Sequence, residues 1–598
     1  MSERAAEAGG TAAIDLETRG GGWLLVTPAQ DRVFTPERCS DEHRLIARTT
    51  AEFVSTEVLP AEARLEEKDW ELARALLRRC GELGLLGINV PEVCGGLDLD
   101  RITSLIVSEE VACSPSFGAT YGAQANLCIL PLLLFGTPDQ QRRYLPRLVS
   151  GELVGAYALS EAGSGSDALA ARTRATRQPD GSFRLTGEKM WITNGGFADV
   201  FIVFAKIDGE QFSAFIVERA FGGVTSGREE DKLGLHGSST TPLVLQDVPV
   251  PAENLLGEPG RGHKVAFNVL NFGRLKLGAM CTGGARATIA EAAAYAASRP
   301  QFGRPIAEFG AIRHKLGEMI ARTYALEAIT YRAAGLVDGI PAPAAGGSRT
   351  LLEALEEFAV EASIAKVAGS EILDFVVDEN VQIHGGNGFV RDYAAERRYR
   401  DARVNRIFEG TNEINRLLIP GLLIKRAVRG ELPLLAAASQ LMDELLGPPA
   451  LETGTGEPLE MEMRTVESCR KVALLGIGAA LQRFGTALEE EQECLLWLAD
   501  LVIDTFAAQS ALLRCRAARN LPDAAQHEDA ARICVAGAAL RVEATARQLL
   551  AAIAEGDTLR SHLAALRRVL RTPTPDAVQA RRRLAAAAVS RGRYPFDR

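Results

Sequence analysis

The sequence predicts a multi-domain protein of the α and β class, with helical regions on both sides of one region of strands. Three observations support this prediction. The chain has 598 residues, which is more than a single hydrophobic core usually covers. The hydrophobic period is helical in residues 35–152, becomes two in residues 153–255, and is helical again from residue 256 onward. A Pro- and Gly-rich break at residues 447–458 then precedes a last helical region.

The composition is that of an ordinary soluble globular protein. Hydrophobic residues make up 47% of the chain and charged residues 24%. The net charge of -10 argues against nucleic acid as a partner, because phosphate binding requires a basic surface. No stretch approaches the roughly 18 uninterrupted apolar residues of a membrane span. The ten cysteines and seven histidines are dispersed, so we expect free thiols in a reducing cytoplasm and no metal site.

The first element along the chain is a predicted flexible arm, residues 1–34, which is rich in Gly, Ala and Thr and carries both charge signs. Residues 35–152 follow as a predicted N-terminal all-α domain. Its apolar residues recur at helical spacing, for example Leu45, Ile46 and Phe53, and Pro-Gly clusters separate the helices.

The second region, residues 153–255, is a predicted middle domain of antiparallel strands. Its short runs are rich in β-branched and aromatic residues and are bounded by Gly, Asp and Pro. The clearest runs are residues 183–186, 200–205, 213–217 and 243–245.

Residues 256–428 return to long helical patterns with short connections, which predict an antiparallel four-helix bundle. A linker, residues 429–463, and an appended helical domain, residues 464–598, complete the chain. Within the linker, residues 432–446 are amphipathic but carry acids and no Lys or Arg, which favours a packing helix over one lying on anionic lipid. The Arg-rich end, residues 580–598, leaves peripheral contact with a membrane open.

The stretch around which the chain is organised for chemistry is residues 403–416. Here Ile407 and Phe408 form an apolar approach to Glu409, and a Gly410-Thr411 corner precedes a helix that Thr411 can cap. A carboxylate beside a hydrophobic wall loses hydration, which raises its pKa toward neutrality. A general base that acts on a weakly acidic C–H needs such a pKa. Glu409 is therefore a candidate catalytic base, and a surface Glu in a turn is the alternative.

Four other clusters accompany this stretch. Residues 157–167 offer backbone amides and hydroxyls where helix gives way to strand, and residues 187–195 end a strand with an indole beside a hydroxyl. Residues 298–306 place two Arg around a Phe, and residues 382–389 are rich in Gly, which lets backbone approach a ligand closely. Each alone has a plain structural alternative, such as a loop, a core aromatic or a solvated helix end. Neither Gly cluster has the spacing of a Rossmann site.

In this order and at these separations, the five motifs resemble the acyl-CoA dehydrogenase family over residues 35–428. The chain looks most like the very-long-chain type, because it continues into a further helical domain and because Phe408 precedes Glu409. The resemblance implies that family's fold with an appended helical domain. It also implies an FAD-dependent oxidoreductase that converts long-chain acyl-CoA thioesters to trans-2-enoyl-CoA in fatty acid β-oxidation.

The resemblance also assigns roles to residues. Glu409 would remove the α-proton while the β-hydrogen leaves as hydride to N5 of FAD, and the Glu409 N–H with a flavin ribityl hydroxyl would polarise the thioester carbonyl. Cofactor contacts would come from Tyr157, Leu159, Ser160 and Ser166 along the flavin, from Trp191, Ile192 and Thr193 at its face and N5, from Arg299, Gln382, Gly385 and Gly386 toward the FAD of a neighbouring subunit, and from Thr411 and Glu413 near its diphosphate. Substrate contacts would come from Ser166, Asn271, Arg274, Phe408 and Gly410.

The partners that the resemblance implies are an electron-transferring flavoprotein and further copies of the chain, with a dimer expected in the cytoplasm. Two alternatives are an assembly or scaffold flavoprotein with little turnover and an acyl-CoA oxidase that uses O₂. The sequence departs from the family pattern at Ala162, where proline is common, and at His236, where Arg or Lys is common. The first departure predicts a less rigid flavin loop, and the second a weaker hold on CoA phosphates.

Overall fold

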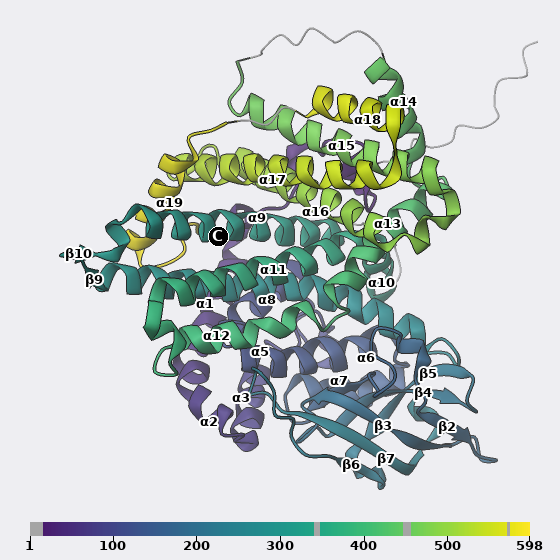
Figure 1. Ribbon diagram of the computed structural model, residues 1–598. Helices are drawn as coiled ribbons and strands as arrows, with labels where there is room; N and C mark the ends of the chain where they lie inside the picture. The colour runs from purple at the N-terminus through teal and green to yellow at the C-terminus, as the bar shows by residue number, and fades with distance from the viewer. Residues whose placement is uncertain (1–15, 340–346, 447–455, 571–573) are drawn as a thin grey trace, which may run out of the picture.

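The computed structural model describes residues 16–339, 347–446, 456–570 and 574–598 (Figure 1). Figure 1 shows the sheet at one end of the molecule, the long bundle helices across the middle, and most of the appended helices stacked on the opposite side of the bundle. The predicted order of an all-α domain, a β-domain, a helical bundle and an appended helical region is confirmed.

The prediction of a flexible arm is wrong for residues 16–34. Trp23 is only 4% exposed, Leu24 is fully buried, and the Trp23 Nε1 donates a hydrogen bond to Glu361 Oε1 at 2.9 Å. The many small residues around them obscured these two apolar anchors. Residues 1–15 of the predicted arm lie outside the described residues.

The all-α domain owes its helix boundaries to N-caps. The side chains of Ser40, Asp69, Asp100 and Thr137 each accept a hydrogen bond from a backbone N–H of the first helical turn. The elements of this domain are α1 (Asp41–Phe53), α2 (Glu62–Glu66), α3 (Trp70–Glu82), α4 (Arg101–Val111), α5 (Pro115–Gly122), the π-helical η8 (Ala123–Ile129), α6 (Leu130–Phe135) and α7 (Pro138–Val149).

The β-domain is one eight-stranded sheet with the order β6-β7-β3-β2-β4-β5-β8, and β1 pairs with β4. Most neighbouring pairs are antiparallel, as predicted, but β4 is parallel to both β1 and β2. This difference arises because β1 and β2 reach β4 through crossovers instead of hairpins. The strands are β1 (Gly155–Ala158), β2 (Arg174–Arg177), β3 (Phe183–Thr193), β4 (Val200–Ile207), β5 (Gln211–Glu218), β6 (Val224–Ser226), β7 (Thr240–Val250) and β8 (Leu255–Leu256).

The bundle is built on long helices whose closest approach depends on glycine. A Cβ on Gly369 would lie 3.2 Å from the Cα of Gly278, so the two helices that carry these residues pack backbone to backbone. The helices are α8 (Gly262–Ser298), α9 (Gly310–Asp338), α10 (Gly347–Glu357), α11 (Ala359–His384), α12 (Ala394–Ala402) and α13 (Asn412–Val428), and a small hairpin, β9 (Pro300–Gln301) with β10 (Arg304–Pro305), joins α8 to α9.

The appended region packs directly on the bundle. The Cβ of a side chain at Gly317 of α9 would come within 2.5 Å of Arg581, so a glycine is needed where the last helix crosses α9. Its helices are α14 (Leu434–Leu446), α15 (Glu460–Phe484), α16 (Gln492–Ala517), α17 (Ala524–Ile553), α18 (Gly556–Val569) and α19 (Ala577–Arg591).

The predicted linker is partly helical. Of residues 432–446, all but the first two form the packing helix that their amphipathic pattern favoured, since α14 (Leu434–Leu446) buries Leu434 and Leu441. The Pro-Gly part, residues 447–455, lies outside the described residues. The break therefore separates two packed helices.

Two helical stretches, residues 115–135 and 492–517, are long and apolar enough to cross a membrane by length and composition. In each, 72% of the most apolar window is buried inside the fold. In the Arg-rich end, Arg581 and Arg583 pair with Glu318 and Asp529. The burial of the two stretches is typical of core helices. The two arginines have carboxylate partners within the protein.

Candidate active site

Glu409 and Gly410 form a strained turn between a 3-10 segment, η14 (Arg403–Arg406), and α13. Both residues are in the left-handed region, with φ of +57° and +78°. Glycine adopts this conformation freely, whereas a glutamate there costs on the order of 1 kcal/mol and persists only where its surroundings hold it. Thr411 caps α13 as predicted, because its hydroxyl accepts from the Ile414 N–H at 3.3 Å.

Three side chains from three helices hold this turn by its carbonyl oxygens. Arg274 Nε of α8 donates to Glu409 O at 3.1 Å, and Lys366 Nζ of α11 donates to Gly410 O at 2.8 Å. Asn415 Nδ2 of α13 donates to Gly410 O at 2.9 Å. Sequence reasoning missed Lys366 and Asn415, although a single lysine inside an apolar helical run was an available signal for the former.

The Glu409 carboxyl is shielded although part of the residue opens on a cavity. Its Oε2 is buried and has no hydrogen-bond partner among the described residues. A Cβ on Gly273 would lie 2.8 Å from this oxygen, so only glycine leaves room for it. Burial raises the pKa of Glu409 to about 7, and the charges of Arg274 and Lys366 oppose this rise only in part. The predicted rise in the pKa is confirmed.

An apolar cavity begins at Glu409 and is lined along one face of α8. It encloses about 920 Å³ of empty space, its open mouth included. The lining residues of α8 extend from Gly273 to Thr288, which corresponds to roughly 22 Å at the rise of an α-helix. Between them α8 contributes Leu277, Met280 and Gly284, and the facing walls include Gly118, Gly122 and Asn126 from α5 and η8, and Leu373 and Val377 from α11.

Near the end of β3, a bulge turns Trp191 outward. The register between β3 and β7 shifts between Lys189 and Ile192, and Trp191 has a φ of +58°. Its side chain is 58% exposed, which excludes the core-aromatic alternative. Ile192 is buried, whereas Thr193 lines the same cavity as Glu409. An exposed indole and a hydroxyl beside the cavity can face a planar polar ring.

Strand β1 and the loop that follows it supply further polar groups. Tyr157 Oη is buried with no hydrogen-bond partner in the described part of the chain. Leu159 and Ser160 are half-buried, and Ser166 is exposed. These residues therefore combine one unsatisfied phenol with accessible hydroxyls.

A buried ion pair stabilises this loop in spite of Ala162. Glu161 Oε1 accepts from Lys189 Nζ at 2.7 Å and from Thr173 Oγ1 at 2.6 Å. Burial raises the pKa of Glu161, but its hydrogen bonds outweigh burial and keep the pKa below the ordinary value. The loss of rigidity expected from the missing proline is therefore offset by a charged anchor.

The residues predicted to reach the FAD of a neighbouring subunit lie at exposed positions near the β9–β10 hairpin and the C-terminal end of α11. Arg299, Gln382, Gly385 and Gly386 are all exposed. None of them lines the cavity that contains Glu409. A built Cβ on either glycine meets no atom within 4 Å, which leaves the backbone accessible. Within one subunit, these four residues therefore lie outside the cavity at Glu409.

The residues predicted to contact substrate divide into two groups. Phe408 lines the cavity beside Glu409. Asn271 and Arg274 are buried and face protein partners, because Asn271 Nδ2 donates to Leu355 O at 3.2 Å and Arg274 holds the Glu409–Gly410 turn. Their contact with CoA stays a prediction, as does the role of the exposed Glu413.

No group of three or more metal-ligating side chains is present among the described residues. The ten cysteines are free thiols, and most of them are buried. Burial raises the pKa of Cys113 to about 12, which disfavours the nucleophilic thiolate.

Four family descriptions match the chain in sequence. The N-terminal domain of acyl-CoA dehydrogenase matches residues 40–152, its middle domain residues 156–248, its C-terminal domain residues 260–421, and a second description of an acyl-CoA dehydrogenase C-terminal domain residues 468–568. This division follows the structural regions described above.

Similar proteins extend this result over the whole chain. A probable acyl-CoA dehydrogenase of Bacillus subtilis (strain 168) is 46% identical over 584 residues, which cover 96% of this chain and 98% of that protein. The human mitochondrial very long-chain specific acyl-CoA dehydrogenase is 36% identical over 503 residues, 78% of this chain and 72% of that protein. A crystal structure of an acyl-CoA dehydrogenase complexed with FAD from Bacillus anthracis superposes with a TM-score of 0.94 at 44% identity, covering 97% of this chain and all of that one.

Fold and site together therefore define a flavin-dependent oxidoreductase that acts on acyl thioesters. The chain belongs to the acyl-CoA dehydrogenase family, and its cofactor is FAD. The residues present fit this cofactor. The exposed Trp191, the unpaired Tyr157 Oη and the uncovered glycines at positions 163 and 165 provide a face, a hydrogen-bonding group and accessible backbone for a large polar ligand.

Proposed function

We propose that Glu409 is the base that removes the α-proton of a long-chain acyl-CoA, which is oxidised to the trans-2-enoyl-CoA. FAD, when bound, accepts the β-hydrogen as a hydride. The observation that carries the proposal is a buried carboxyl oxygen without a partner, located where an apolar cavity begins.

The surroundings of Glu409 suit this task. A pKa of about 7 leaves a large part of the carboxyl ionised at neutral pH and still basic enough to take a proton. The Glu409 backbone N–H has no acceptor among the described residues, so it is available to the thioester oxygen on which negative charge develops. Arg274 and Lys366 fix the carbonyl side of the same turn.

The length of the cavity supports a long acyl chain as substrate. Its lining on α8 continues for four turns beyond Glu409, and Gly118, Gly122 and Gly284 leave the space free of side chains at their positions. Burying methylene groups along such a wall contributes about 0.8 kcal/mol each. A short acyl chain would leave most of this surface unused.

The proposal also includes the partners implied by the family resemblance. Electrons would leave to an electron-transferring flavoprotein, and the enzyme would act as a cytoplasmic homodimer. The exposure of Arg299 and Gln382 outside the cavity supports a role across a subunit boundary. The ion pairs of the C-terminal arginines give no support to contact with a membrane.

The test is anaerobic mixing of the FAD-loaded protein with palmitoyl-CoA while flavin absorbance is followed. We expect bleaching in the wild type and its loss in Glu409→Gln, since a positioned base contributes about 10²–10⁴-fold. Both proteins should contain equal FAD. Unbleached wild-type flavin with acyl-CoA of every length would refute the proposal and favour a scaffold protein, whereas stoichiometric peroxide in air would indicate an oxidase.

A further inference from the structure

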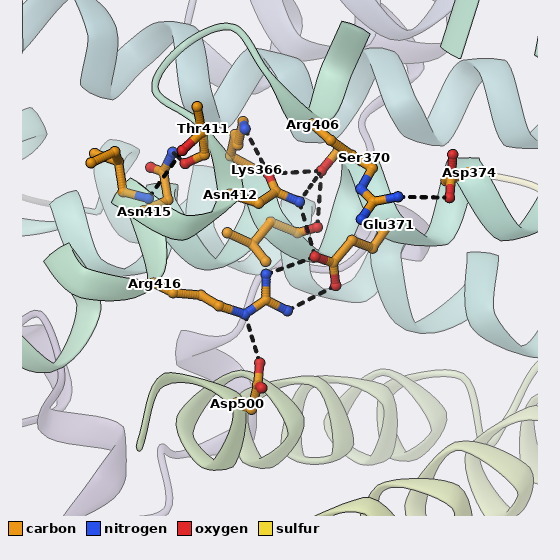
Figure 2. A network of polar contacts seen from close by, with 12 residues as sticks. Lys366, Ser370, Glu371, Asp374, Arg406, Thr411, Asn412, Asn415, Arg416 and Asp500 are labelled. Carbon is orange, nitrogen blue, oxygen red and sulfur yellow. Dashed lines mark hydrogen bonds and ion pairs between the residues drawn. The ribbon is translucent and has the colours of Figure 1, made fainter. Parts of the chain in front are cut away.

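A continuous path of polar contacts connects the Glu409–Gly410 turn to the appended helical region (Figure 2). It begins at Lys366, whose Nζ donates to Gly410 O at 2.8 Å and to Asn412 Oδ1 at 2.6 Å. Asn412 is the first residue of α13. One ammonium group therefore holds both the catalytic turn and the start of the helix that follows it.

The amide of Asn412 continues the path on α11. Its Nδ2 donates to Ser370 Oγ and to Glu371 Oε1, both at 3.0 Å. Asn412 is 2% exposed and Ser370 is fully buried, so water does not replace these contacts. The orientation of the Asn412 amide, and with it one contact of Lys366, thus depends on the position of Glu371.

Arg416, one turn further along α13, joins Glu371 to Asp500 of α16. Its Nη1 and Nη2 donate to the two carboxylate oxygens of Glu371 at 2.6 and 2.9 Å, and its Nε donates to Asp500 Oδ1 at 2.8 Å. A guanidinium that binds a carboxylate with two parallel bonds has a fixed plane. Figure 2 shows the side chain of Arg416 between Glu371 of α11 and Asp500 of α16.

The charges along the path alternate from the turn outward. Lys366 is followed by Glu371, then by Arg416 and Asp500. Burial tends to raise the pKa of Glu371, but the hydrogen bonds and charge of Arg416 keep it below its ordinary value. Each charge thus has an opposite charge or a polar group to fix its position.

We infer that Asp500 and Arg416 are positioning residues for the Glu409 turn, so that the appended domain contributes to the reaction although none of its described residues lines the cavity. The left-handed conformation of Glu409 needs support from its surroundings. Loss of the outermost anion removes one of the two carboxylates that hold Arg416, so that Glu371 and Asn412 become less fixed and Lys366 holds the turn less tightly. The catalytic part of this inference rests on the proposed function.

The test compares Asp500→Asn with Asp504→Asn in the full-length, FAD-loaded protein. Asp504 is the matched control because it lies one turn further along α16 and pairs with Arg541 at 2.7 Å within the appended region. Hydrogen exchange, followed by mass spectrometry, should be faster at residues 407–415 in Asp500→Asn and unchanged there in Asp504→Asn. The limiting rate of flavin reduction by palmitoyl-CoA should fall about three- to thirtyfold only in Asp500→Asn, with the Kd for substrate kept within about twofold.

A second variant tests whether the residues act along one path. Arg416→Lys keeps the charge but not the two-pronged contact, so its effect combined with Asp500→Asn should be smaller than the sum of the single effects. Equal exchange at residues 407–415 in Asp500→Asn and Asp504→Asn would overturn the inference whatever the activity. Altered exchange in a protein whose flavin is never bleached would instead remove the proposed function and leave the positioning path in place.

Discussion

At the scale of single residues, Glu409 combines two energetic costs that suit its proposed role as a base. Its backbone is in the left-handed region, and its carboxyl is buried without a hydrogen-bond partner on Oε2. Burial keeps the carboxyl basic near neutral pH, and the strained turn directs it toward the cavity. Arg274, Lys366 and Asn415 offset these costs, because they hold the two carbonyl groups of the turn in place.

The raised pKa of Glu409 predicts the pH dependence of the reaction. The base acts only when ionised, so the kcat/KM for palmitoyl-CoA should rise with pH up to about 7 and then level off. Steady-state assays from pH 5.5 to 9 with an artificial electron acceptor measure this profile. A profile that is flat below pH 7 would contradict the assignment of Glu409 as the ionising group.

The same pKa predicts a gain in stability in Glu409→Gln. The folded-state pKa lies above the ordinary value of 4.5, so the wild type loses stability as the pH rises from 4.5 through 7. The variant lacks this loss, and its advantage should approach about 3 kcal/mol at pH 8 and vanish at pH 4.5. Thermal melts at both pH values test this, and an equal difference at both would exclude the titration as its cause.

The buried Lys276 predicts a pH dependence of folding stability that is opposite in sign to that of Glu409. Burial lowers the pKa of Lys276 to about 7, and Asn126 is the hydrogen-bond acceptor for its ammonium group. The unfolded chain binds more protons between pH 7 and 10.5, so this lysine makes stability rise with pH in that window. Lys276→Met should flatten the change in Tm between pH 7 and 9.5. An unchanged slope would show that the lysine is already solvated.

At the scale of elements, α8 determines the shape of the site. Its buried face carries Gly273 beside the base, then Leu277, Met280, Gly284 and Thr288 along the cavity. The glycines place no side chain in the space between the helices, and the larger residues supply an apolar wall. Under the proposed function, we therefore expect this one face to set the preference for acyl-chain length.

A substitution midway along this face predicts a change in substrate preference. Met280 lies seven residues beyond Gly273, roughly 10 Å along the cavity. Met280→Trp should lower the kcat/KM for palmitoyl-CoA at least about tenfold, because burial of the methylene groups that the indole displaces contributes several kcal/mol. The kcat/KM for butyryl-CoA should change little. Met280→Leu is the control that keeps the volume. An equal loss for both substrates in Met280→Trp would indicate a folding defect.

The sequence predicted elements where a hydrophobic period was clear and missed features that depend on distant partners. The long helices within residues 256–428, the cap at Thr411 and the raised pKa of Glu409 follow from local pattern and local chemistry. The parallel pairing of β4 and the support of the turn by Lys366 depend on segments that meet only in the fold. The exposed Trp191 depends on a bulge that no period indicates.

At the scale of the whole molecule, the segment before α1 joins the bundle to the appended region. Trp23 binds Glu361 of α11 through its indole N–H, and its ring centroid lies 4.6 Å from that of Phe506 of α16. Gln30 Nε2 donates to Leu513 O of the same helix at 2.9 Å. The segment before α1 and helix α16 of the appended region therefore stabilise one another directly.

Trp23→Ala tests this connection. Removing a buried Trp costs about 3–5 kcal/mol, and here it also leaves the buried Glu361 with one fewer donor. We expect a lower Tm and faster limited proteolysis in the appended region than in the β-domain. Trp70→Ala, at a half-buried Trp of α3, is a control for the loss of an indole elsewhere. Equal proteolysis of the two regions in Trp23→Ala would contradict the connection.

Arg514 of α16 has a consequence for how such a chain can evolve. Its guanidinium is fully buried and pairs at 2.7 Å with Glu37 ahead of α1 and with Glu327 of α9. A gene cut near codon 428 would encode a portion in which Glu37 and Glu327 lose this cation, and the apolar surface of α9 that packs on the appended helices would face water. Once such a pairing was acquired, loss of the extra helices would require simultaneous repair at several sites. Selection can therefore remodel this region far more readily than discard it.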